Sequence, residues 1–266
     1  CLDNAEHDLP AGVMDEVRAQ MRALEEKTGK TFGSSDNPLL VSVRSGSAMS
    51  MPGMMDTILN LGLNIETLKA LIAQTGNERF GWDAYRRFIQ LFGKVALGVP
   101  DEAFDEEFEA VKEKSGATQD IALTARDLHE ISDRFLDVVE RETGNPFPDD
   151  PMEQLEIAVK AVFNSWMGKR AVDYRREFNI TPQMANGTAV NVCTMVFGNL
   201  GDDCATGVGF TRYPDTGENR LFGEYLVNAQ GEDVVAGIRT PKSIDMMQEE
   251  MPDMYQELLV LRERLE

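Results

Sequence analysis

The chain of 266 residues is poor in cysteine, histidine and basic side chains. Its three cysteines, Cys1, Cys193 and Cys204, are odd in number and lack metal-site spacing, so we expect reduced thiols in an intracellular protein. Lys and Arg number 26 against 46 Asp and Glu, and the net charge of −20 disfavours nucleic acid and anionic membranes as partners. Neither a membrane-length apolar run nor a signal-peptide pattern is present. We therefore expect a cytoplasmic protein.

Hydrophobic residues make up 42% of the chain and charged residues 27%, which is the balance of a folded globular protein. This length allows one large domain or two smaller ones with conventional cores. The chain begins at Cys1 rather than at Met, and we expect it to be partial. Because the negative charge also repels small anions, a site for a polyanionic ligand here would need local arginines and a divalent cation.

Helical periodicity dominates residues 64–149, where no β-type alternation occurs. Asn64, Asp101 and Thr124 are predicted N-caps, and Asp127 completes a capping box with Thr124. The predicted helices span residues 65–74, 79–97, 103–114 and 124–142, and the terminating glycines are Gly76, Gly116 and Gly144. We interpret this region as an all-helical insert.

The regions on either side of the insert mix helices with strands. Helices are predicted at residues 10–29, 152–166, 170–178 and 246–265, and strands at residues 39–43, 187–196, 206–211, 223–227 and 234–238. The predicted fold class is therefore α+β, with two lobes. The first lobe comprises residues 1–63 and 150–197, the helical insert residues 64–149, and the second lobe residues 198–266.

The most informative segment spans residues 41–57. A buried strand from Leu39 to Val43 breaks at Arg44 into a loop of Ser, Gly, Ala, Met and Pro. Such a loop brings backbone N–H groups within reach of a polyphosphate, while Arg44 supplies positive charge. Gly53 allows backbone geometry that other residues adopt only at a cost. From spacing alone, a tight strand-to-helix turn with a solvated arginine is equally favoured.

Six strings of residues closely resemble the pyruvate phosphate dikinase family, in its nucleotide-binding region. They are residues 44–46, 50–62, 85–90, 161–166, 188–199 and 223–237, and the second contains Ser-Met-Pro-Gly-Met-Met-Asp-Thr. The resemblance runs through nearly the whole chain. It implies an ATP-grasp fold, in which two lobes close on a nucleotide, here incomplete at both ends.

The resemblance also implies roles for individual residues. Arg44 would grip the nucleotide phosphates and act in catalysis, beneath a lid-like loop. Residues implied to contact the nucleotide are Arg44, Ser50, Met51, Gly53, Met55, Arg87, Met195, Val196, Thr206, Gly207 and Glu232. Met195 and Val196, with Phe197, would enclose the adenine. No residue of this chain is assigned to a metal.

Each of these assignments has a structural alternative. At least one of Met51, Met54 and Met55 is expected to fill the core. The Arg86–Arg87 pair fits a solvated helix face, and residues 195–197 fit a buried strand. Acids such as Glu232 and Asp233 more often stabilise turns than bind ligands.

The resemblance implies that the complete enzyme converts ATP, phosphate and pyruvate into AMP, pyrophosphate and phosphoenolpyruvate, with Mg²⁺. A phosphohistidine domain and a pyruvate-binding domain would be further parts of that enzyme, and a homodimer one assembly of it. Neither His7 nor His129 lies in a phosphohistidine-like motif, so we expect this chain alone to be inactive. The alternatives are phosphoenolpyruvate synthase, a glucan-phosphorylating relative, and a non-catalytic nucleotide-sensing or structural module. The Met-Pro-Gly-Met-Met loop argues against the first two.

Overall fold

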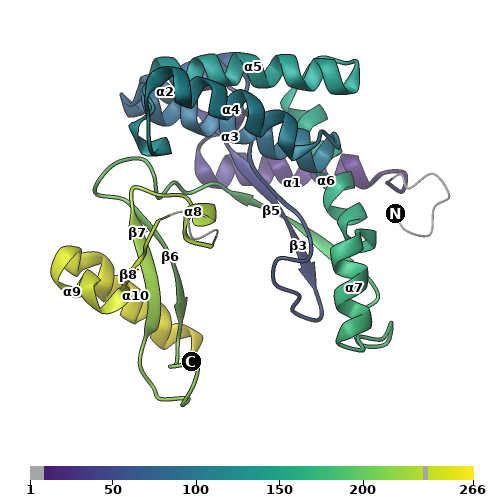
Figure 1. The fold of residues 1–266 in the computed structure, drawn as a ribbon. Coiled ribbons are helices and arrows are strands. Elements are labelled where there is room, and N and C mark those ends of the chain that lie inside the picture. Colours follow the sequence, from purple (N-terminus) through teal and green to yellow (C-terminus); the bar gives the residue numbers. More distant parts are fainter. Residues whose placement is uncertain (1–8, 236–238) are drawn as a thin grey trace. The chain divides into compact units, whose positions relative to one another are not determined.

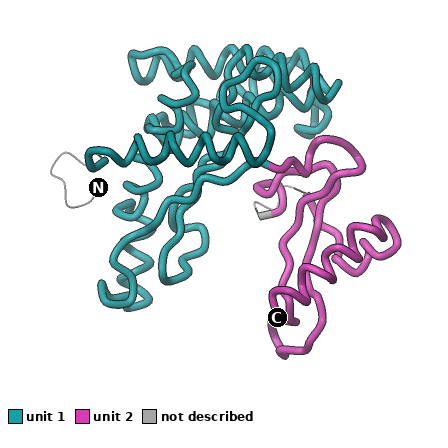
Figure 2. Tube along the Cα trace, turned by 180° about the vertical axis from the view of Figure 1, so that it is seen from behind, with its two compact units in different colours: residues 1–195 teal, residues 196–266 magenta. Residues whose placement is uncertain are grey.

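The computed structural model describes residues 9–235 and 239–266 (Figure 1). The chain divides into two compact units, Cys1–Met195 and Val196–Glu266, called here the first and the second unit (Figure 2). Both units combine helices with a three-stranded sheet, so the fold is mixed α+β. None of the described helices combines the length and the apolar character that crossing a membrane requires.

The main sheet of the first unit is antiparallel, in the order β4-β3-β5. Its strands are β3 (Val41–Ser47), β4 (Thr57–Leu61) and β5 (Thr188–Thr194). Two short parallel strands, β1 (Thr31–Phe32) and β2 (Pro38–Leu39), precede it. The prediction that the strand ends at Arg44 was wrong, because β3 continues to Ser47, and β4 was not predicted. Residues 45–47 are weak strand formers by themselves, but each pairs with a residue of β5.

Four helices occupy residues 64–149 of the first unit: α2 (Ile65–Thr75), α3 (Glu78–Ala96), α4 (Asp101–Ser115) and α5 (Ala125–Thr143). A short 3₁₀ helix, η1 (Asp120–Ala122), precedes α5. The N-cap predicted at Asn64 and the capping box predicted at Thr124 are present, and Asn64 also forms a capping box with Thr67, which was not predicted. Left-handed glycines end α2, α4 and α5 as predicted. Asp101 was wrongly predicted as an N-cap. Pro100 holds that position, and α4 starts without a side-chain cap.

Helix α3 lies at the centre of the first unit. It packs against α2, α4, α5 and α6 (Pro151–Asn164), and also against β4. Phe80, Phe88 and Phe92 are fully buried on it, and Phe147, from the linker between α5 and α6, packs edge-on against the last two. Helix α6 covers β3, β4 and β5. The helices of residues 64–149 and the sheet therefore share one core.

Further helices complete the first unit (Figure 1). They are α1 (Val13–Thr28), η2 (Ser165–Met167) and α7 (Lys169–Glu177).

Gln154 of α6 is fully buried, and its amide accepts from Gly62 N and donates to the carbonyl oxygens of Leu63 and Pro148 at 2.9–3.0 Å. This side chain joins the end of β4 to the linker that precedes α6.

The second unit is built on the antiparallel sheet β6-β7-β8. Its elements are β6 (Ala205–Phe210), β7 (Phe222–Val227), α8 (Gly231–Val235), β8 (Lys242–Ser243), η3 (Ile244–Met246), α9 (Met247–Glu250) and α10 (Pro252–Leu265). The strand predicted at residues 234–238 was wrong at Val234, which is helical, and residues 236–238 lie outside the described residues. The closing helix breaks before Pro252, because proline fits a first helical turn but not a helix interior.

Candidate functional site

One face of the β4-β3-β5 sheet carries small and polar side chains around Arg44. Side chains alternate along a strand, so Ser42, Arg44 and Gly46 share a face opposite to the buried Val41 and Val43. Strand pairing sets Cys193, Asn191 and Ala189 of β5 opposite Ser42, Arg44 and Gly46. These three residues of β5 are exposed. The face is therefore polar and is open at Arg44 and Asn191, whereas Ser42 is buried.

The guanidinium of Arg44 is exposed and held by a neutral group. Its Nε donates to Ser42 Oγ at 3.1 Å, and this hydroxyl donates to the carbonyl of Cys193 at 3.4 Å. Within residues 9–235 and 239–266, Arg44 forms no ion pair, although the sequence has 46 acids. An arginine held this way keeps N–H groups for an anion.

Gly46 leaves room for the amide of Asn191 on the same face. A Cβ there would lie 2.7 Å from Nδ2 of Asn191, so a larger side chain would displace this amide. Its backbone N–H donates to Thr188 Oγ1 at 3.0 Å. Asn191 of β5 thus lies opposite Arg44 of β3, and its amide adds a donor and an acceptor there.

The loop of residues 48–56 joins β3 to β4. Met51 is 5% exposed and packs in a small cluster with Trp166 and Ala185, against which Met54 and Met55 also lie. The core-filling interpretation is therefore correct for Met51. Ser50 and Gly53 are exposed. Gly53 has φ 71°, which is the left-handed geometry that favours glycine.

Polar contacts hold the end of the loop. Arg170 Nη2 pairs with Asp56 Oδ1 at 2.6 Å, and its Nη1 donates to the carbonyl of Gly53 at 3.4 Å. Asp56 N donates to Ser165 Oγ at 3.2 Å. Sequence reasoning missed these three contacts, since the residues that each contact joins lie more than a hundred positions apart and no local signal pairs them.

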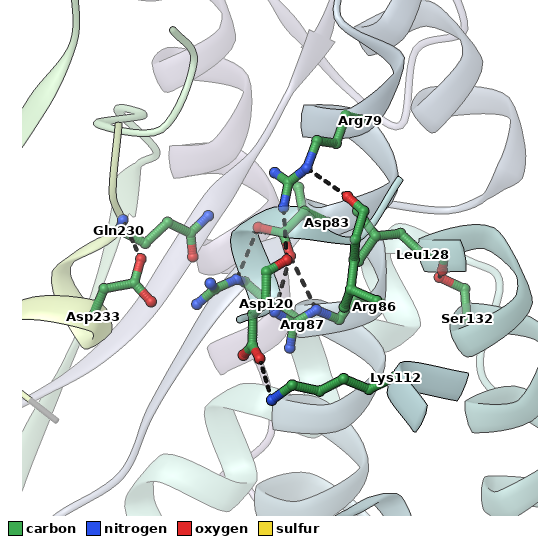
Figure 3. Close-up of polar contacts among 12 residues, drawn as sticks. Arg79, Asp83, Arg86, Arg87, Lys112, Asp120, Leu128, Ser132, Gln230 and Asp233 are labelled. Atoms are coloured by element: carbon green, nitrogen blue, oxygen red, sulfur yellow. Dashed lines mark hydrogen bonds and ion pairs between the residues drawn. The ribbon is translucent and has the colours of Figure 1, made fainter. Parts of the chain in front are cut away.

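A buried ionic cluster lies on α3 (Figure 3). Asp83 accepts from Arg86 Nε and from Arg87 Nε, each at 3.0 Å, and the arginine side chains are only 8% and 15% exposed. The solvated-face interpretation of these arginines was therefore wrong. Burial raises the pKa of Asp83, but the charges of Arg86, Arg87 and Arg79 outweigh it and lower the pKa to about 2.

Arg79 and Lys112 connect this cluster to the segment before α5. Arg79 donates to the carbonyl oxygens of Asp120 and Leu123 at 3.0 and 2.8 Å, and Lys112 pairs with the Asp120 carboxylate at 2.9 Å (Figure 3). The cluster thus holds η1 against α3. These contacts fix η1 and α3 relative to each other, which is a structural role.

The predicted adenine segment follows β5. Met195 N donates to the carbonyl of Leu40 at 2.9 Å, which adds one backbone contact beyond the end of β5 at Thr194. Val196, the first residue of the second unit, is 88% exposed. The interpretation of residues 195–197 as a buried strand was therefore wrong.

The predicted residues of the second unit lie in two elements. Thr206 and Gly207 are in β6, and a Cβ on Gly207 would lie 2.6 Å from the carbonyl of Glu224, so close packing on β7 requires glycine. Glu232 lies in the first turn of α8. Asp233 Oδ2 accepts from Gln230 N at 2.8 Å, which is the turn-stabilising role (Figure 3).

The described part of the chain contains no group of three His, Cys, Asp or Glu side chains that could hold a metal ion. His129 stacks on Trp82 with ring centroids 3.9 Å apart. Cys193 and Cys204 are free thiols. His7 and Cys1 lie outside the described residues.

The chain is similar to known proteins along almost its whole length. Residues 5–264 match the family model described as "Pyruvate phosphate dikinase, AMP/ATP-binding domain". The pyruvate, phosphate dikinase of Entamoeba histolytica is 60% identical over 260 residues, 97% of this chain and 29% of that protein. Those of Giardia intestinalis and Clostridium symbiosum are 53% and 50% identical, with 97% and 99% of this chain and 29% and 30% of those proteins covered. The chain thus spans under a third of the length of these relatives.

Proposed function

We propose that the sheet face around Arg44 holds the phosphates of ATP. The premise is that this chain belongs to the pyruvate phosphate dikinase family, whose AMP/ATP-binding domain it matches. The observation that carries the proposal is the state of Arg44. It is exposed, oriented by Ser42 and without an ion pair among the described residues. A guanidinium presented in this way matches two phosphate oxygens at once.

The loop of residues 48–56 supports the same proposal. It follows the strand that carries Arg44, and its residues Ser50 and Gly53 are exposed, where backbone N–H groups can approach an anion. Asn191 adds an uncharged polar group beside Arg44. Catalysis at such a site consists of positioning phosphates and balancing their charge.

The other assignments are also part of the proposal. Arg87, Met195, Val196, Thr206, Gly207 and Glu232 are proposed nucleotide contacts, and the two compact units are proposed as lobes of an ATP-grasp fold. Mg²⁺ would supply positive charge that offsets the charge of the ATP phosphates. We assign it no ligand, because the described residues offer no cluster of three acids.

The reaction belongs to a larger protein in this proposal. A complete dikinase would convert ATP, phosphate and pyruvate into AMP, pyrophosphate and phosphoenolpyruvate, using a phosphohistidine domain and a pyruvate-binding domain. The present chain would supply binding and orientation of ATP. This division is consistent with a match to under a third of the relatives.

Calorimetric titration with Mg-ATP tests the proposal. We expect weak, saturable binding that Arg44→Ala lowers by about tenfold or more, since a hydrogen bond to a charged group contributes roughly 1.5–3 kcal/mol. Arg18→Ala is the matched control, because Arg18 is an exposed arginine on α1 paired with Asp15. Competition by tripolyphosphate would locate the contact at the phosphates. Equal affinity of the Arg44→Ala variant and the wild type would exclude the proposed site, and no heat from the wild type would favour a structural module.

A further inference from the structure

We propose that the corner formed by η2 and α7 is a built seat for the loop of residues 48–56, and that Arg170 is a positioning residue which fixes this loop. The inference rests on the proposed function for what the loop binds. The seat itself rests on contacts within the first unit alone. Figure 1 shows α7 beside the end of the β3 hairpin where this loop lies.

The apolar part of the seat receives Met51. This side chain is buried with Trp166 of η2 and with Ala185, and Tyr174 of α7 and Ile180 pack against the same cluster. The cluster is small and separate from the core around α3. A loop that only needed to connect two strands would not require such a buried anchor at its centre.

Trp166 is itself held independently of the loop. The guanidinium of Arg175 lies 3.9 Å from the centroid of its ring and donates to its backbone carbonyl at 2.8 Å. Burial lowers the pKa of Arg175, and its contact with the aromatic face offsets part of the lost hydration. The seat is therefore preformed by η2 and α7, and the loop docks onto it.

Arg170 makes the polar part of the seat. It contacts the loop at two points, the Asp56 carboxylate at 2.6 Å and the Gly53 carbonyl at 3.4 Å. One contact is at the end of the loop and the other at its left-handed glycine, so the guanidinium spans the segment after Met51. The backbone of residues 51–56 is thereby held while Ser50 and Gly53 stay exposed.

Because Arg170 is exposed, its role in positioning the loop can be tested separately from any role in folding. Its side chain is 63% exposed, and ion pairs of this kind contribute little to stability. Removing it should leave the fold intact but free the loop to leave the seat. A preformed loop binds phosphates better than a mobile one, because the cost of ordering it has already been met.

Fluorescence of Trp166 tests the seat directly. The chain has two tryptophans, so a Trp82→Phe background leaves Trp166 as the single reporter. We expect Arg170→Met to raise the acrylamide quenching constant about twofold, because a loop held by few contacts opens locally without global unfolding. Circular dichroism and the melting temperature should stay near those of the parent.

Two further variants sharpen this measurement. Lys169→Met is the matched control, because Lys169 is 90% exposed and pairs with Asp173 on its own helix. It should leave quenching unchanged. Arg170→Lys should give an intermediate value, since an ammonium cannot span both contacts as a guanidinium does. If the acrylamide quenching constant of Arg170→Met equals that of Lys169→Met, Arg170 does not fix the loop on the seat, and the proposal is overturned.

Titration of the same variants with Mg-ATP tests positioning. We expect Arg170→Met to weaken binding by about threefold to tenfold, in line with the loss of a preorganised contact, and Lys169→Met to bind as the parent does. Increased quenching with unchanged affinity would overturn the positioning role. If the parent binds no Mg-ATP, the proposed function fails, and the quenching result still decides whether the seat exists.

Discussion

The arginines of α3 and the arginine of β3 occupy opposite environments. Arg86 and Arg87 are almost completely buried, and both donate to the Asp83 carboxylate. Arg44 is exposed and donates to the neutral hydroxyl of Ser42. The first arrangement resists separation because a buried charge without its partner is costly, while the second leaves an open cation for an anion. Burial and the charge of the partner thus distinguish arginines fixed in an ion pair from an exposed arginine that is held only by a neutral group.

The largest change in unfolding free energy is expected when the carboxylate that Arg86 and Arg87 share, that of Asp83, is removed. Asp83→Ala leaves two buried guanidinium groups without it, and we expect a loss of about 3–5 kcal/mol in the free energy of unfolding. Urea denaturation measures the change. The control is Asp15→Ala, whose exposed pair with Arg18 should matter by less than about 1 kcal/mol. Similar losses in both variants would contradict a structural role for the α3 cluster.

A second test uses pH. The pKa of Asp83 is lowered to about 2 in the folded protein from 3.8, so its ionised form favours folding. The stabilisation is fully present above the unfolded pKa and is lost as pH falls from about 4 towards 2, with a total of about 2 kcal/mol. The difference in unfolding free energy between the wild type and Asp83→Asn should shrink over this interval. A constant difference would contradict the lowered pKa.

The smallest change in unfolding free energy is expected when Arg44 is replaced. Because this side chain is exposed and has no ion pair among the described residues, Arg44→Ala should change the unfolding free energy by no more than about 0.5 kcal/mol. Thermal and urea denaturation measure it. Combined with weaker Mg-ATP binding, an unchanged stability would set Arg44 apart from Asp83. A loss comparable to that of Asp83→Ala would place both residues in one structural class.

The helices of residues 64–149 were predictable because their signals are local. Capping boxes at Asn64 and Thr124 and left-handed glycines at Gly76 and Gly144 act within one helical turn. Observed boundaries accordingly lie within about two residues of the predicted ones. The error at Asp101 is of the same size: Asp101 was predicted as the N-cap but is the first residue of α4, and the N-cap is Pro100, one residue earlier.

The strands around the candidate site were less predictable. Residues 45–47 have no strong strand propensity, and their conformation depends on β5, where Gly46 N meets Thr188 Oγ1 across a separation of 142 residues. The environment of Arg87 depended in the same way on packing around α3. Arg170 gave no local signal, since its partner Asp56 lies 114 residues away.

The amino-acid sequence by itself determined the helices with their caps, the acidic charge and the family likeness, because these depend on neighbouring residues or on composition. Only the tertiary structure decided that Arg44 stands within a strand on an open polar face, that Arg87 is buried beside Asp83, and that Met51 and Arg170 dock the loop on α7. The physical reason is that strand pairing, burial and loop docking depend on elements far apart in the chain. Even Asp83 and Arg87, which are four residues apart on α3, are buried only because other helices pack over them.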